Sequence, residues 1–183
     1  MTVPHAQCSA VSHAVHDCDY AATRMATRIS TALSSAGVAH QTLVGDINRR
    51  AVDLNRRDSR YSTEFREHIR QLVTTMHTTH NVFTLDIHSY PKHHEWSGRT
   101  EYSMVFLYAG GPAPGWVSKL AASIKKTLMK NITIIDNIGL VNDIQDELHA
   151  LGFKAVLMEF NESNTIITEE YLAVAVREWA KAV

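Results

Sequence analysis

"VFTLDIHSYP", residues 82–91, joins an apolar run to three polar side chains and a proline. Its β-branched, aromatic and aliphatic residues are typical of a strand in the interior of a sheet. Pro91 ends the run because proline cannot donate a ladder hydrogen bond. The predicted strand therefore finishes with Asp86, His88 and Ser89. A histidine at this position either bonds a backbone carbonyl or serves a functional site, and the rest of the chain bears on the choice.

The remaining sequence alternates short apolar runs with longer segments of helical period. It predicts strands at residues 2–6, 38–47, 82–89, 102–109, 132–136 and 154–160, and helices at 17–36, 62–79, 115–129, 140–151 and 168–181. Asp17 or Asp19 caps the start of the first helix, and Gly37 follows its end. Such alternation predicts an α/β fold, a three-layer sandwich with a mixed, mostly parallel sheet and helices on both faces. We expect residues 1–183 to form one domain.

Composition excludes several classes of protein. The 183 residues carry a net charge of −1, so no overall positive field would attract nucleic acid or an anionic membrane. No apolar run reaches the roughly 18 residues of a membrane span, and "MTVPHAQCSA" (1–10) has no signal-peptide pattern. Two cysteines do not make a disulfide framework and favour a reducing compartment. We therefore expect a cytoplasmic protein, of oligomeric state that the sequence does not specify.

Chemically active residues follow the predicted strands. His5 and Cys8 come at the end of the first strand, "NRRAVDLNRR" (48–57) follows the second, and Glu159 lies near the end of the last. In parallel sheets, functional groups gather where the carboxyl ends of strands meet. The sequence thus predicts that these groups and His88 share one rim.

Four segments in this order carry a resemblance to a known family: "VPHAQC" (3–8), "RRAVDLNR" (49–56), "LDIHS" (85–89) and "VLMEFNE" (156–162). Together they resemble the zinc carboxypeptidase-like amidohydrolases, and most closely the N-formylglutamate amidohydrolase branch. The resemblance implies a zinc-dependent hydrolase in which metal-activated water cleaves an amide bond. The implied substrate is a small molecule bearing a carboxylate, such as an N-acyl amino acid or a short peptide.

The resemblance also implies the metal ligands. His5, Cys8 and His88 would bind one Zn2+ ion, leaving a fourth position open as in catalytic zinc sites. Relatives have His-x-x-Glu where this chain has His-x-x-Cys, and a thiolate is a good zinc ligand. If Cys8 is not the third ligand, Asp17 or Asp19 is the alternative. Asp86 either supports a ligand histidine or pairs with a nearby arginine.

The other roles fall to Glu159 and the arginine-rich segment. Glu159 would take a proton from the water and pass it to the leaving amine. Asn55 and Arg56 would bind the substrate carboxylate, because a guanidinium grips a carboxylate with two parallel hydrogen bonds. Arg49 or Arg50 would help to hold the carboxylate or would polarise the reacting carbonyl. Asp53 is expected to orient these arginines.

Two other functions remain open. One is a catalytically inactive protein on the same fold that binds a carboxylate or a phosphate. The other is a metal-dependent esterase or phosphodiesterase. Zinc content would separate the first from an enzyme, and a panel of substrates would separate the second from an amidohydrolase.

Overall fold

The computed structural model describes residues 1–8, 18–57, 59–90, 104–108, 113–128, 133–136, 142–162 and 169–183. The strands are β1 (Thr2–Val3), β2 (Leu43–Val44), β3 (Phe83–Tyr90), β4 (Met104–Tyr108), β5 (Thr133–Asp136) and β6 (Lys154–Asn161). The helices are α1 (Ala22–Ser35), α2 (Arg60–His77), α3 (Gly115–Leu128), α4 (Asp143–Ala150) and α5 (Glu169–Ala182). Each corresponds to one predicted element. The first two strands are shorter than predicted, and α1 begins at Ala22 instead of residue 17.

The strands form one sheet in the order β2-β1-β3-β6-β4-β5. β2, β1, β3 and β6 run parallel to one another, and β4 runs antiparallel to β6 but parallel to β5. The predicted mixed, mostly parallel sheet is therefore confirmed. β3 and β6 lie at its centre, where their apolar residues are buried on both faces.

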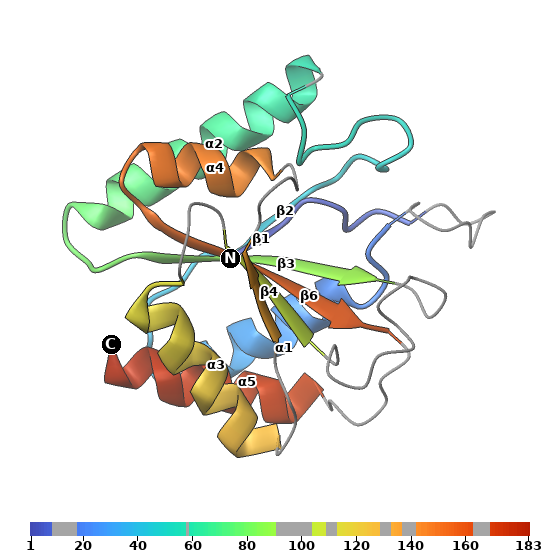
Figure 1. Ribbon diagram of the computed structural model, residues 1–183. Helices are drawn as coiled ribbons and strands as arrows, with labels where there is room; N and C mark the ends of the chain where they lie inside the picture. The colour runs from blue at the N-terminus through green and yellow to red at the C-terminus, as the bar shows by residue number, and fades with distance from the viewer. Residues whose placement is uncertain are drawn as a thin grey trace.

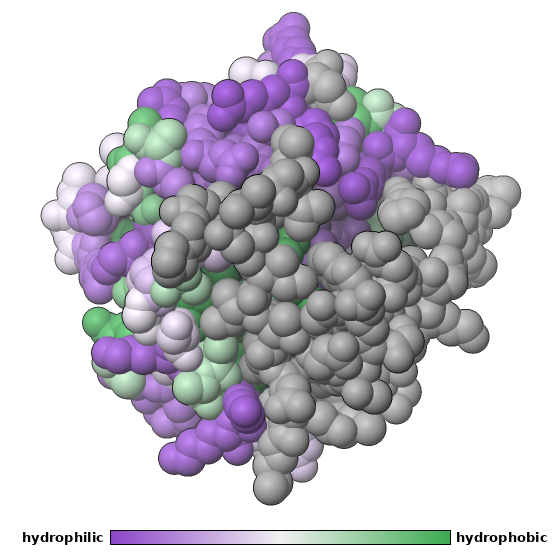
Figure 2. Space-filling view, in the orientation of Figure 1, coloured by the Kyte–Doolittle hydropathy of each residue, from purple (hydrophilic) through white to green (hydrophobic). Residues whose placement is uncertain are grey.

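Helices cover both faces of the sheet (Figure 1), with α1, α3 and α5 on one face and α2 and α4 on the other. Alternate residues of each strand point to opposite faces. Ile87 and Met158 belong to the core beneath the first group of helices, whereas Ala155 packs with residues of α2 and α4. The outer side of the α2 and α4 layer is mostly hydrophilic (Figure 2). Among the described residues, no helix has both the length and the hydrophobicity to cross a bilayer.

The register of the two central strands brings two predicted site residues together. His88 on β3 lies beside Glu159 on β6. Neighbouring parallel strands in register send paired side chains to the same face, and Glu159 shares that face with Ala155. Both side chains therefore lie on the α2 and α4 face, near the carboxyl ends of their strands.

Gly45, directly after β2, allows the backbone of Pro4 and the side chain of Leu54 to lie close to the chain. A Cβ atom at this position would lie 2.3 Å from the Pro4 carbonyl oxygen and 2.6 Å from Leu54 Cδ1. We expect Gly45→Ala to lower the free energy of unfolding by about 1–3 kcal/mol, the usual cost of overpacking. Gly115→Ala is the matched control, since a Cβ there meets nothing within 4 Å. Urea unfolding of both variants measures the difference, and equal stabilities would contradict the prediction.

Candidate metal centre

His5, Asp19 and His88 come together as a possible metal-binding group, with one ligand atom from each within 4.8 Å of the others. Asp19 Oδ2 lies 3.2 Å from His5 Nδ1 and 2.7 Å from His88 Nδ1. The two imidazole rings meet edge to face, with centroids 4.9 Å apart. All three residues are buried. Both Nδ1 atoms therefore face the same carboxylate oxygen.

Three separate segments supply these side chains. His5 follows β1, His88 lies near the end of β3, and Asp19 precedes α1. The Asp19 amide donates a hydrogen bond to the His5 carbonyl at 3.0 Å, which returns the chain to the sheet edge before the helix begins. Because β1 and β3 pair in parallel, their carboxyl ends lie at one edge, as the sequence predicts.

Each histidine has a carboxylate on its second nitrogen. His5 Nε2 lies 2.7 Å from Asp53 Oδ1, and His88 Nε2 lies 3.2 Å from Asp86 Oδ2. In metal sites the ligating histidine commonly donates its other N–H to a carboxylate, which sets the tautomer and the ring orientation. Both histidines are thereby arranged to offer Nδ1 to a common ion. Asp86 therefore contacts a histidine, as one of the two roles expected for it requires.

The side chains of this group shift one another's pKa values. Burial alone would raise the pKa of the Asp19 carboxyl, but His5 and His88 outweigh burial and hold that pKa well below its usual range. Burial would lower the pKa of His88, but Asp86 and Asp19 raise it well above its ordinary value. Positive charge is therefore favoured at the point where the ligand atoms converge. Two imidazole nitrogens and one carboxylate oxygen are a donor set that fits zinc.

Glu159 lies beside this group with an unsatisfied atom. Its Oε2 is buried and has no hydrogen-bond partner among the described residues. Burial raises the pKa of Glu159 to about 7, although the positive charge of His88 opposes the shift. A buried carboxyl oxygen without a partner is costly, and this one lies beside three potential ligands. The expected place of Glu159, close to His88, is the one that the structure shows.

Arg49 reaches the same group from the loop after β2. Its Nε lies 3.3 Å from Asp53 Oδ2, and its Nη1 lies 3.7 Å from Asp19 Oδ1. Asp53 thus contacts both Arg49 and His5, which confirms its expected role of orienting an arginine. Arg49 adds positive charge near Glu159 and favours the ionised form of that carboxyl.

Asn55 and Arg56 have contacts that leave their predicted roles untested. The buried Asn55 accepts a hydrogen bond on Oδ1 from the Ile144 amide, at 3.4 Å, in the first turn of α4. Arg56 Nη1 donates to the Asn55 carbonyl at 3.3 Å, and the Arg56 carbonyl accepts from Arg66 Nη1 at 2.6 Å. Asn55 therefore ties the arginine-rich loop to α4. Binding of a substrate carboxylate by Asn55 and Arg56 stays a prediction.

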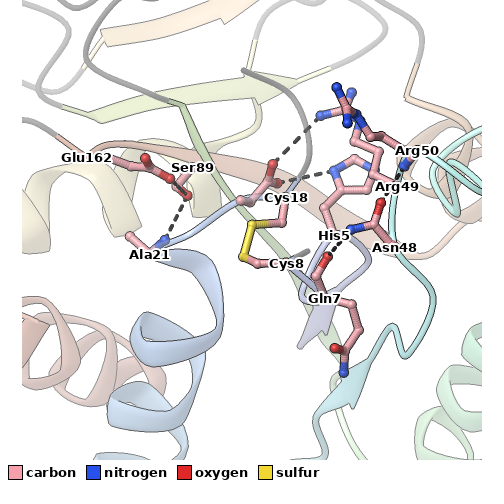
Figure 3. The surroundings of a disulfide bond; sticks show 11 residues. His5, Gln7, Cys8, Cys18, Ala21, Asn48, Arg49, Arg50, Ser89 and Glu162 are labelled. Carbon is pink, nitrogen blue, oxygen red and sulfur yellow. Dashed lines mark hydrogen bonds and ion pairs between the residues drawn. A yellow bond between two sulfur atoms is a disulfide. The ribbon is translucent and has the colours of Figure 1, made fainter. Parts of the chain in front are cut away.

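The prediction that Cys8 is a zinc ligand is wrong, because Cys8 forms a disulfide with Cys18 (Figure 3). A sulfur atom in a disulfide carries no negative charge and cannot bind a metal as a thiolate. Asp19, one of the two alternatives stated, lies in the possible metal-binding group instead. The other alternative, residue 17, lies outside the described residues. The expectation of unpaired cysteines is also wrong, so these residues give no support for a reducing compartment.

Comparisons with known proteins support the fold and give no information on the chemistry. No family model and no curated protein matches the chain. A solved structure, the gene product Atu2144 from Agrobacterium tumefaciens, is similar with a TM-score of 0.69 and 15% identity. The match covers 99% of this chain and 88% of that one. The similarity therefore shows a shared α/β fold over almost the whole chain.

The metal-free protein is expected to lose stability as pH rises from about 5 to about 8. Glu159 has a pKa of about 7 in the folded protein against an ordinary 4.5, so the native state keeps a proton that the unfolded state releases. His88, whose pKa is also raised, acts in the same direction above its ordinary 6.5. Because the native state binds more protons, the free energy of unfolding falls by about 3 kcal/mol through Glu159, with a further fall through His88.

Urea unfolding of metal-free protein at several pH values measures this effect. Glu159→Gln should remove the part of the loss that falls between pH 4.5 and about 7. A stability that stays constant or increases over that interval in the unsubstituted protein would contradict the raised pKa values.

Proposed function

We propose that this protein is a zinc-dependent hydrolase that cleaves an amide bond in a small carboxylate-bearing substrate. His5, Asp19 and His88 would hold one zinc ion. The observation that supports the proposal most is the buried, unpaired Oε2 of Glu159 beside this group. A site that only binds an ion has no need of such a carboxyl. An inactive binding protein would be more stable with the group paired or replaced.

Each residue of the centre has a definite task in this proposal. A bound zinc ion would supply a Lewis acid that polarises a carbonyl group and makes a neighbouring water more acidic. Glu159 would accept the proton of that water on Oε2 and deliver it to the leaving amine. A pKa of about 7 suits both transfers near neutral pH. Asp53 and Asp86 would keep the histidine rings in place during turnover.

The preference for a carboxylate-bearing substrate rests on the arginine-rich loop. Asp53 and Asp19 hold the Arg49 guanidinium close to the metal centre, and its side chain is about 25% exposed. Arg49 would polarise the scissile carbonyl, and Arg56 in the same loop would receive the substrate carboxylate. N-acyl amino acids and short peptides are the simplest compounds that present both groups.

The test combines metal analysis with a substrate panel. Zinc-loaded protein is assayed on N-formyl and N-acetyl amino acids, on dipeptides, and on ester and phosphodiester analogues. Turnover of the amides, lost on chelation and restored by zinc, supports the proposal. Turnover of only the esters or phosphodiesters would contradict amide hydrolysis, and binding of zinc without any turnover would favour an inactive binding protein.

Arg56→Ala is expected to weaken productive binding of carboxylate-bearing substrates by about 2–4 kcal/mol in kcat/KM, since a charge-assisted pair is lost. The same variant should lose much less on a substrate whose carboxylate is amidated. Arg60→Ala is a matched control, because the Arg60 side chain is exposed and pairs with Glu64 on α2. Equal losses by Arg56→Ala on charged and amidated substrates would mean that Arg56 is structural.

A further inference from the structure

The Cys8–Cys18 disulfide ties together the two chain segments that bring His5 and Asp19 to the metal centre. Cys8 lies three residues after His5, and Cys18 directly precedes Asp19. Their Cα atoms are 5.0 Å apart. In Figure 3 the disulfide lies between His5 and the start of α1. His88, by contrast, is held on the central strand β3 and does not depend on this link.

Asp19 is restrained on its other side by hydrogen bonds. The Ala21 amide donates to Ser89 Oγ at 3.1 Å, and Ser89 Oγ donates to Glu162 Oε1 at 2.7 Å (Figure 3). The hydroxyl thus anchors the beginning of α1 to the end of β3. Among these restraints on the Asp19 segment, the disulfide is the covalent one, and reduction can open it reversibly.

The disulfide is also accessible. Cys8 is exposed and Cys18 is partly exposed, although Asp19 beside it is buried. A thiolate can therefore approach the sulfur of Cys8 from solvent. Exposed disulfides are more readily reduced than buried structural ones.

We propose that the Cys8–Cys18 disulfide is a site of thiol–disulfide exchange that controls the affinity of the centre for zinc. The inference rests on the metal centre of the proposed function. A dithiol reductant is the co-reactant. One thiolate of the reductant attacks the Cys8 sulfur, the Cys8–Cys18 bond breaks, and the Cys18 thiolate leaves and is protonated. The second thiol of the reductant then displaces the Cys8 thiolate, which is protonated, and the reductant leaves as its own disulfide. Two electrons and two protons thereby pass to the protein.

Reduction lowers zinc affinity because the segment that carries Asp19 loses its covalent link to the segment that carries His5. In the oxidised protein the carboxylate is ordered before the ion arrives, whereas after reduction the ion must order the segment itself. The hydrogen bonds of Asp19 to His5 and of Ala21 to Ser89 remain. We expect an affinity about tenfold weaker, at the lower end of the range for loss of support around a metal ligand.

The experiment compares zinc dissociation constants, measured by competition with a chromophoric chelator, in three preparations. These are the oxidised protein, the same protein reduced with a dithiol and desalted without oxygen, and Cys8→Ser/Cys18→Ser, which has neither a disulfide nor a thiol. Circular dichroism checks that each is folded. The inference requires about tenfold weaker binding in the reduced protein, and the same loss in the double variant if that variant folds.

Equal affinities in the oxidised and reduced protein would overturn the inference. Tighter binding by the reduced protein would also overturn it, because a Cys8 thiolate would then be a ligand. Zinc binding by none of the preparations would overturn the metal centre itself, so failure of the proposed function is distinguishable from failure of the redox control.

Discussion

Glu159→Gln is expected to leave zinc bound and to lower kcat/KM by about a hundred- to ten-thousand-fold, the usual cost of losing a general base. Glutamine has nearly the same shape as glutamate but cannot accept the proton of the attacking water. The substitution removes no hydrogen bond from Oε2, which has no partner among the described residues. The folded protein should therefore be at least as stable as the original.

Steady-state kinetics and zinc analysis of the same sample measure this effect. Glu67→Gln is the matched control, because Glu67 is an exposed carboxylate on α2 that pairs with Arg70. The control should keep full activity. A Glu159→Gln variant that keeps both its zinc and its rate would exclude Glu159 as the base.

His88→Ala is expected to abolish zinc binding, which makes it the second large effect. The substitution removes one of the three ligands and leaves the buried carboxylates of Asp19 and Asp86 without the imidazole that separates them. Loss of one partner from a buried charged pair costs about 3–5 kcal/mol. The metal-free variant should therefore also unfold at lower urea concentration than the metal-free original.

The control for His88→Ala is a histidine outside the centre. His80 is exposed and contacts Thr79 at the end of α2, so His80→Ala should bind zinc as the original does. Elemental analysis after dialysis measures the zinc of both variants. Zinc at the original affinity in His88→Ala would mean that His88 is only a packed strand-end histidine.

The central strands were predictable because their sequences leave few choices. β3 and β6 have long apolar runs, each bounded by a change of composition, and both were located to within about one residue. The positions of His88 and Glu159 at their carboxyl ends follow directly. β1 and β2 were predicted too long, because they pair with each other through two residue pairs only. β1 pairs with β3 through one, and the chain then enters the loops that carry the site.

The sequence named Asp19 only as an alternative to Cys8, because the local pattern did not decide between them. Cys8 is close to His5 in sequence, whereas Asp19 is far from it in sequence but contacts it in space through both backbone and side chain. Asp19 was also a plausible helix cap, but α1 begins later, with Ala21 at its N-cap and no side-chain cap hydrogen bond. The carboxylate of Asp19 contacts the histidines instead. The two cysteines were the sequence signal that could have located Asp19, since a bond between Cys8 and Cys18 brings Asp19 close to His5.

Zinc titration of the metal-free, disulfide-bonded protein is the most direct test of the metal centre. The account predicts one zinc ion per chain. Binding should release protons, because a protonated imidazole must lose a proton before its nitrogen can bind the metal. It also predicts that Asp19→Ala loses this ion. Cobalt in place of zinc should show no thiolate charge-transfer band, since the two cysteine sulfurs are bonded to each other. No bound ion, or an ion retained with unchanged affinity by Asp19→Ala, would contradict the centre formed by His5, Asp19 and His88.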